Sequence, residues 1–242
     1  MPMKRSDYKP SCNISNDLQP LIDMIDPCPQ YVIKLEHETR MQRDSSLWFN
    51  ERQYRLTASN FGLVLNRKAA PTEKFLSSLI TKKDLSSIAA IQYGIDNEPF
   101  ALSKYRNYMA NSGKHVDVLP CGLAMNRSFS WLGATPDGKI IVADTQSYGL
   151  LEIKCPYSFK DVTHGKIQLK TSHHYYSQIQ GQMGVCGLDF RDFVIYTKKG
   201  MSIQRIPFHQ QFWDEMLDKI SIFYLTHLAP YIVKNRFDAN DA

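Results

Sequence analysis

The sequence has few cysteines, and none of them is paired at a metal-binding spacing. Its five cysteines are odd in number, and no Cys-x-x-Cys pair occurs. This pattern argues against a disulfide framework and against a four-cysteine zinc or iron–sulfur centre. We therefore expect a protein of the reducing cell interior, either nuclear or cytoplasmic.

Long apolar runs are missing as well. The N-terminal stretch MPMKRSDYKPSCNISNDL is basic but lacks the apolar core of a signal peptide, and no segment is long enough to span a bilayer. The sequence therefore predicts a soluble, unsecreted protein. A net charge of +5 permits a polyanionic partner without requiring one.

The 242 residues can bury one substantial core, and we expect a single domain over residues 31–237. Residues 1–30 hold five of the twelve prolines and show little periodicity, which predicts an extended arm. Residues 238–242 form a short tail. From residue 31 as far as Gly113, the spacing of apolar residues is helical, and Pro99 either starts a new helix or kinks a continuous one.

After Gly113 the hydrophobic period changes to two, which predicts short strands up to Cys155. A helix over residues 172–186, a strand pair within 191–208 and a long amphipathic helix over 210–237 complete the chain. This order predicts an α/β (α+β) fold in which helices flank a mixed β-sheet.

Two acids and a lysine stand out within the strand region. If DGKIIVA and YGLLEIKC form a hairpin with its turn inside residues 144–147, Asp137 lies opposite Lys154. Because side chains alternate along a strand, Glu152 and Lys154 share one face and Ile153 points to the other. Asp137 is then expected to join the cluster of Glu152 and Lys154.

Converging carboxylates repel each other unless a cation lies between them, and oxygen ligands suit Mg²⁺ or Mn²⁺. An ammonium group beside such a cation can orient a water molecule that attacks a phosphodiester. A simpler interpretation of the same letters is an ordinary Pro-Asp-Gly turn and an exposed cross-strand ion pair, worth under about 1 kcal/mol. The other segments of the chain favour the metal site.

Four segments, in order, resemble the PD-(D/E)XK nuclease core, in particular the lambda exonuclease and YqaJ-like viral recombinase family. They span Trp48 to Met183, a little over half of the chain. The segments are SSLWFNERQYRLTASNFG, IQYGIDNEPFALSKY, the pair GATPDG and LLEIKCP, and YYSQIQGQM.

The resemblance implies a restriction-endonuclease-like core and a Mg²⁺-dependent deoxyribonuclease. It implies an exonuclease of recombination type that degrades duplex DNA from an end, 5′ to 3′. Two Mg²⁺ or Mn²⁺ ions would be held by Glu98, Asp137, Glu152 and the Ile153 carbonyl. Lys154 would position the attacking water.

The same resemblance assigns two further roles. Gln178 matches the glutamine of the family's helix that helps to order the site, and Arg52 and Ser59 match positions that grip the 5′-phosphate of the degraded strand. A guanidinium fork, a hydroxyl and free N–H groups at a helix start suit an anion. Arg55 competes for this role, because the family pattern has a second basic position nearby.

The partners implied are double-stranded DNA ends, a single-strand annealing protein and, by analogy, two further copies in a ring-shaped trimer. Residues 1–45 and the helix from Gln210 match no family motif. One alternative is an endonuclease of the same core, from a mobile element or restriction system, which would cut closed circles. A second is a non-catalytic DNA-end-binding module, although the intact set of acids and lysine argues against it.

Overall fold

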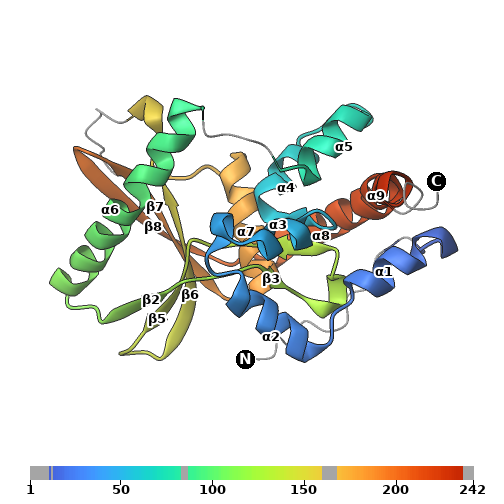
Figure 1. Ribbon diagram of the computed structural model, residues 1–242. Helices are drawn as coiled ribbons and strands as arrows, with labels where there is room; N and C mark the ends of the chain where they lie inside the picture. The colour runs from blue at the N-terminus through green and yellow to red at the C-terminus, as the bar shows by residue number, and fades with distance from the viewer. Residues whose placement is uncertain (1–10, 12, 83–86, 160–167, 237–242) are drawn as a thin grey trace.

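The computed structural model describes residues 11, 13–82, 87–159 and 168–236. A five-stranded mixed sheet has the order β2-β5-β6-β7-β8, and a three-stranded sheet has the order β1-β4-β3 (Figure 1). The strands are β1 Leu56–Thr57, β2 Val116–Leu119, β3 Ala124–Met125, β4 Leu132–Ala134, β5 Gly138–Val142, β6 Ser147–Lys154, β7 Phe190–Thr197 and β8 Gly200–Pro207. The predicted fold class, a mixed sheet flanked by helices, is confirmed.

The helices alternate with these strands along the chain. The α-helices are α1 Gln19–Ile25, α2 Pro29–Glu38, α3 Ser46–Arg52, α4 Ala58–Leu65, α5 Glu73–Ile80, α6 Ala89–Asn111, α7 His174–Cys186, α8 Gln210–Phe223 and α9 Ala229–Arg236. Short 3-10 helices are η1 Asn16–Leu18, η2 Gln42–Asp44, η3 Arg127–Phe129 and η4 Tyr157–Phe159, and a π-helical turn, η5 Tyr224–Leu228, joins α8 to α9. In the described part of the chain, every helix is too short or too polar to cross a membrane.

Two helices sandwich the larger sheet. Helix α6 buries Ala101, Tyr105 and Met109, spaced four residues apart, against one face. Helix α7 packs Ile179 and Met183 against the other face. It also supplies the crossover that parallel strands require, because β6 and β7 run parallel and α7 lies between them in sequence.

The N-terminal segment differs from its predicted extended form. Prolines 20 and 29 stand in the first turns of α1 and α2, where a missing N–H costs nothing, and so they begin helices rather than prevent them. Leu21 and Ile25 are buried in the core that α1 shares with α4, α8 and α9. Residues 1–10, residue 12 and the predicted tail 238–242 lie outside the described residues, and the predicted domain boundaries stay a prediction.

The hairpin of β5 and β6 forms as expected, but with a different register. Gly138 pairs with Leu151 and Val142 with Ser147, so Asp137 lies across from Glu152 rather than Lys154. The turn begins at Ala143, one residue earlier than predicted. Because the register changes by two residues, each side chain keeps its predicted face.

Helix α6 continues through Pro99 instead of restarting there. Since proline has no N–H, the carbonyl of Ile95 lacks its usual helical partner. Glu98 therefore projects from the middle of a continuous helix that packs against the sheet.

Candidate active site

Two parallel strands bring the predicted phosphate-binding and acidic segments to one edge of the smaller sheet. Strand β1 pairs with β4, with Thr57 opposite Gly133. The chain leaving each strand therefore emerges at the same edge. Ser59 follows β1, and Asp137 follows β4.

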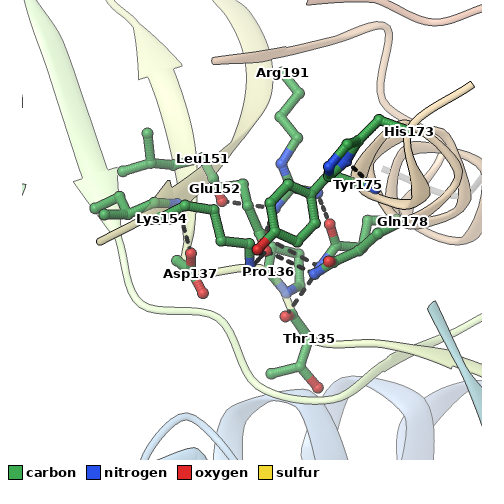
Figure 2. Close-up of polar contacts among 12 residues, drawn as sticks. Thr135, Pro136, Asp137, Leu151, Glu152, Lys154, His173, Tyr175, Gln178 and Arg191 are labelled. Carbon is green, nitrogen blue, oxygen red and sulfur yellow. Dashed lines mark hydrogen bonds and ion pairs between the residues drawn. The ribbon is translucent and has the colours of Figure 1, made fainter. Parts of the chain in front are cut away.

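Asp137 is tied to the start of the β5–β6 hairpin. Its backbone N–H donates to the Leu151 carbonyl at 3.2 Å, and its Oδ2 accepts a hydrogen bond from the Ile153 N–H at 2.7 Å (Figure 2). Burial raises the pKa of Asp137 to about 8, and the charges of Glu152 and Glu98 add to this rise. The raised pKa shows that a bare carboxylate is disfavoured here.

Glu152 is a buried anion surrounded by donors, with 2% of its surface exposed. Figure 2 shows side chains from β6, α7 and β7 converging on it. Its Oε1 accepts from Lys154 Nζ and Gln178 Nε2, both at 2.6 Å, and its Oε2 accepts from Gln182 Nε2 at 3.3 Å and from Arg191 Nη2. These four bonds use the four lone-pair sites of a carboxylate. Although burial by itself would raise the pKa of Glu152, Lys154 and Arg191 hold it below its ordinary value.

Lys154 lies on the same face as Glu152, as predicted. Its ammonium group also lies 5.1 Å from the centre of the Tyr175 ring. Burial opposes the charged form, but the charges of Glu152 and Asp137 outweigh it and raise the pKa of Lys154. The side chain is therefore a charged donor at neutral pH.

Glu98 faces a cavity of about 550 Å³ at the end of β6, which we call the acid cavity. Burial raises the pKa of Glu98, and the charge of Arg43 partly offsets that rise. The Glu98 carboxylate makes no hydrogen bond with any described residue. The lining of the acid cavity includes Arg43, Ile91, Ile95, Glu98, Asp137, Ile153, Lys154 and Tyr175.

A second cavity of about 460 Å³ adjoins the acid cavity, and we call it the arginine cavity. Arg52 lies over the Trp48 ring at 4.0 Å and donates to Thr57 Oγ1 at 3.4 Å. Burial lowers the pKa of Arg52 to about 10. The lining includes Arg43, Trp48, Phe49, Arg52, Ser59, Asn60, Ile91 and Ile95.

Arg55 does not share that environment. It is 1% exposed, forms an ion pair with Glu51 and donates to the carbonyls of Ser130 and Ile25. Its guanidinium is engaged by protein groups at every nitrogen. The structure therefore gives Arg55 a role in holding the fold, and the phosphate-binding role considered for it from the sequence is not supported.

The acidic residues suit a divalent cation only in part. Among the described residues, no three His, Cys, Asp or Glu side chains stand close enough to share an ion. The Glu98 carboxylate and one oxygen of Asp137 form no hydrogen bond with any described residue. The pKa values of both groups are raised, so a nearby positive charge would stabilise their ionised forms. The Ile153 carbonyl points to the same open edge as its N–H. Glu152 can become a ligand only when one of its four donors moves away.

The family model of the YqaJ-like viral recombinase domain matches residues 47–189, more than half of the chain. The chain belongs to this family. Apart from Arg43, the described residues that line either cavity lie within the range matched by the YqaJ-like family model. No curated protein matches the sequence significantly.

Solved structures are similar to this YqaJ-like chain over most of its length. One is LHK-Exo in complex with dAMP, with 28% identity, a TM-score of 0.62, and coverage of 82% of this chain and 100% of that one. Another is the alkaline exonuclease LHK-Exo from Laribacter hongkongensis, with 27% identity, a TM-score of 0.61 and the same coverage. A SOX–DNA complex shares the fold at 9% identity, with a TM-score of 0.50 and coverage of 92% and 74%.

Sequence reasoning missed three residues of this YqaJ-like site. Gln182 reaches Glu152 because it lies one helical turn after Gln178, and that spacing was a usable signal. Gln180 instead donates to the carbonyl of Pro207, the last residue of β8, and accepts from the His209 N–H. No sequence pattern marked Arg191 or Arg43. Arg191 reaches the site because β7 pairs with β6, and Arg43 reaches it because η2 folds beside the acidic segment.

Proposed function

We propose that this YqaJ-like domain is a Mg²⁺-dependent deoxyribonuclease that hydrolyses phosphodiester bonds from a duplex DNA end, 5′ to 3′, during recombination. The observation that carries the proposal is the pair of adjoining cavities. One holds Asp137, Glu98 and Lys154, and the other holds the half-buried Arg52 beside a helix start. The alkaline exonuclease at 27% identity supports the same activity.

The acidic side of the site would hold the metal, expected as two Mg²⁺ or Mn²⁺ ions. Glu98, Asp137 and the Ile153 carbonyl are the available oxygen groups, with Glu152 joining them after it separates from Lys154. Bound there, a divalent ion supplies positive charge beside the scissile phosphate. Gln178 and Arg191 both contact Glu152 and would keep it oriented if Lys154 moved away.

Lys154 acts in this proposal as a donor that orients the attacking water. Its raised pKa keeps the ammonium charged at neutral pH, so it cannot accept the proton of that water. Once it leaves Glu152, its three N–H groups can reach the water and a phosphate oxygen.

The arginine cavity would take the 5′-phosphate of the strand end. Arg52 is a half-buried guanidinium that forms no ion pair with any described residue, and a partly desolvated charge of this kind is stabilised by an anion. Ser59, in the first turn of α4, adds a hydroxyl to the same wall. This pairing underlies the proposed preference for 5′-phosphorylated ends.

A specific observation favours one other function, a non-catalytic DNA-end-binding module. Glu152 is already saturated by four donors, so the site as it stands leaves no lone pair of Glu152 for a metal. In such a module the acids and the lysine would serve only the fold. Titration with Mn²⁺ separates the two functions, because the module would bind none at this site.

The activity is tested with linear 5′-phosphorylated duplex, 5′-hydroxyl duplex and closed circular DNA in Mg²⁺. The wild-type protein should degrade the phosphorylated duplex fastest and leave circles intact, and Lys154→Ala should abolish degradation. Arg52→Gln should slow only the phosphorylated substrate. Circle cleavage would select an endonuclease, and equal rates on both linear substrates would reject the end-phosphate assignment.

Assembly belongs to the same proposal. By family analogy, we propose a ring-shaped trimer around duplex DNA and cooperation with a single-strand annealing protein. Sedimentation velocity gives the oligomeric state directly. A monomer at all concentrations tested would reject the trimer without affecting the nuclease assignment.

A further inference from the structure

A short segment ahead of α3 is anchored directly to the acidic site. Gln42 has a φ of 46°, a left-handed conformation that is uncommon outside glycine. Its side-chain amide donates to the carbonyls of Cys121 at 2.9 Å and Pro136 at 3.2 Å. Pro136 immediately precedes Asp137, so the backbone of Arg43, next to Gln42, is held against the acidic segment.

The side chain of Arg43 lies where the acid cavity meets the arginine cavity. Three residues line both cavities, Arg43, Ile91 and Ile95, and the arginine is the charged one. Arg43 is exposed and forms neither a hydrogen bond nor an ion pair with any described residue. By contrast, Arg40, three residues earlier, is engaged with Glu36 at 2.8 Å.

The charge of Arg43 acts on the acid cavity without being neutralised there. It lowers the pKa of Glu98 against the effect of burial, yet no ion pair forms between the two side chains. A guanidinium that is fixed at its backbone, free at its head and located at a passage between two cavities is suited to an anion in that passage.

We propose that Arg43 binds an internal phosphate of the DNA strand, between the end phosphate at Arg52 and the bond cleaved beside Lys154. This inference rests on the proposed nuclease function and adds a third phosphate contact to it. A strand that extends from one cavity into the other must pass this residue, because Arg43 forms part of both walls.

Binding is measured by fluorescence anisotropy with a 3′-labelled, 5′-phosphorylated duplex in EDTA, where no cleavage occurs. Arg43→Gln should weaken binding about tenfold, as loss of one charge-assisted hydrogen bond implies. The slope of log K against log salt should decrease by about 0.7 to 0.9, the contribution of one phosphate contact. Arg43→Lys should keep the slope.

The control is Arg127→Gln, because Arg127 is another exposed arginine but lines neither cavity. It should leave both affinity and slope close to wild type. If Arg43→Gln behaves like this control while wild type still binds DNA ends, the inference is overturned and the proposed function stands. If wild type does not bind DNA ends, the proposed function fails first.

A chemical double-mutant cycle locates the phosphate. An uncharged methylphosphonate replaces each linkage nearest the 5′ end in turn. At one linkage Arg43→Gln should cause no further loss of affinity, since the methylphosphonate has already removed the contact. On a duplex with a 5′-hydroxyl end, Arg43→Gln should still weaken binding. Two results would overturn the inference. One is an equal loss of affinity at every linkage, and the other is a loss of affinity that disappears when the 5′-phosphate is removed. The second result is the one expected of Arg52→Gln.

Discussion

Glu152 sits in an environment that stabilises its charge without a metal. Lys154 and Arg191 both contact the carboxylate, and their side chains are 25% and 0% exposed. A fully buried ion pair that loses one partner leaves an uncompensated charge, whereas a partly exposed lysine can turn toward solvent. Under the proposed function, Lys154 is therefore the donor that would move away to let Glu152 bind a cation.

Replacing that donor should change metal affinity and activity in opposite directions. In Lys154→Met, one oxygen of Glu152 loses a donor and a positive charge leaves the site, so Mn²⁺ should bind about tenfold more tightly while DNA cleavage is lost. Isothermal titration calorimetry measures the affinity. Lys139→Met removes a lysine that lies over Tyr148 and serves as the control. Weaker Mn²⁺ binding in Lys154→Met would contradict the idea that Lys154 and the metal ion compete for Glu152.

The raised pKa of Asp137 predicts a pH-dependent stability in metal-free protein. The folded pKa is about 8, above the ordinary value of 3.8, so between these pH values the folded state binds the proton and the unfolded state does not. The free energy of unfolding should therefore fall as pH rises through that window.

Asp137→Asn keeps an acceptor for the Ile153 N–H but removes the titration. In EDTA it should match wild type near pH 4 and exceed it by about 1–3 kcal/mol at pH 9. Urea unfolding at each pH gives the difference. With Mg²⁺ present, the difference at pH 9 should shrink, because wild type has one more carboxylate for the ion and binds it more tightly. A pH-independent difference would exclude Asp137 as the titrating group.

Two arginines three residues apart show what the sequence could predict at this scale. Both Arg52 and Arg55 fitted the basic positions of the family pattern, and the letters could not rank them. Their surroundings differ, because Arg55 is enclosed by protein acceptors while Arg52 faces a cavity, and the phosphate-binding role of Arg52 stays a proposal. The positions of Glu152, Lys154 and Gln178, by contrast, followed from strand alternation and a family helix.

Among the elements, the type of each predicted helix and strand was easier to predict than its exact pairing. Apolar periodicity located β5, β6 and α7, but a turn that begins one residue earlier than expected changed the partner of Asp137. The proline content of residues 1–30 predicted an extended arm, but Pro20 lies in the first turn of α1, whose apolar face is buried in the core. Turn chemistry and long-range packing settle both features, and neither is visible in a local window.

Helices α4 and α7 pack closely, and this contact can be tested with glycines. A Cβ at Gly181 would lie 2.4 Å from the ring of Phe61, which is fully buried, whereas a Cβ at Gly94 in α6 would meet nothing within 4 Å. Gly181→Ala should lower the free energy of unfolding by about 1–3 kcal/mol. Gly94→Ala should raise it by about 0.5–1 kcal/mol. Chemical denaturation compares the two, and equal effects would refute the tight contact.

On the scale of the whole molecule, the N-terminal helix completes the core formed by α4, α8 and α9. Leu21 is fully buried there, whereas Met24 on the same helix is 48% exposed. Leu21→Ala should destabilise the protein by about 2–5 kcal/mol. Met24→Ala should remain within about 0.5 kcal/mol of wild type. Thermal and urea unfolding test this pair, and a neutral Leu21→Ala would favour the extended arm predicted from the sequence.

The backbone ladder between β1 and β4 has a consequence for the reaction products. Ser59 and Asp137 follow its two strands by only a few residues, so under the proposed function the hydroxyl beside the end phosphate and one acid of the metal site are connected through one short set of peptide hydrogen bonds. Such a ladder does not stretch between one turnover and the next. Under the proposed function it works as a molecular ruler, which makes every released fragment the same length whatever base it carries.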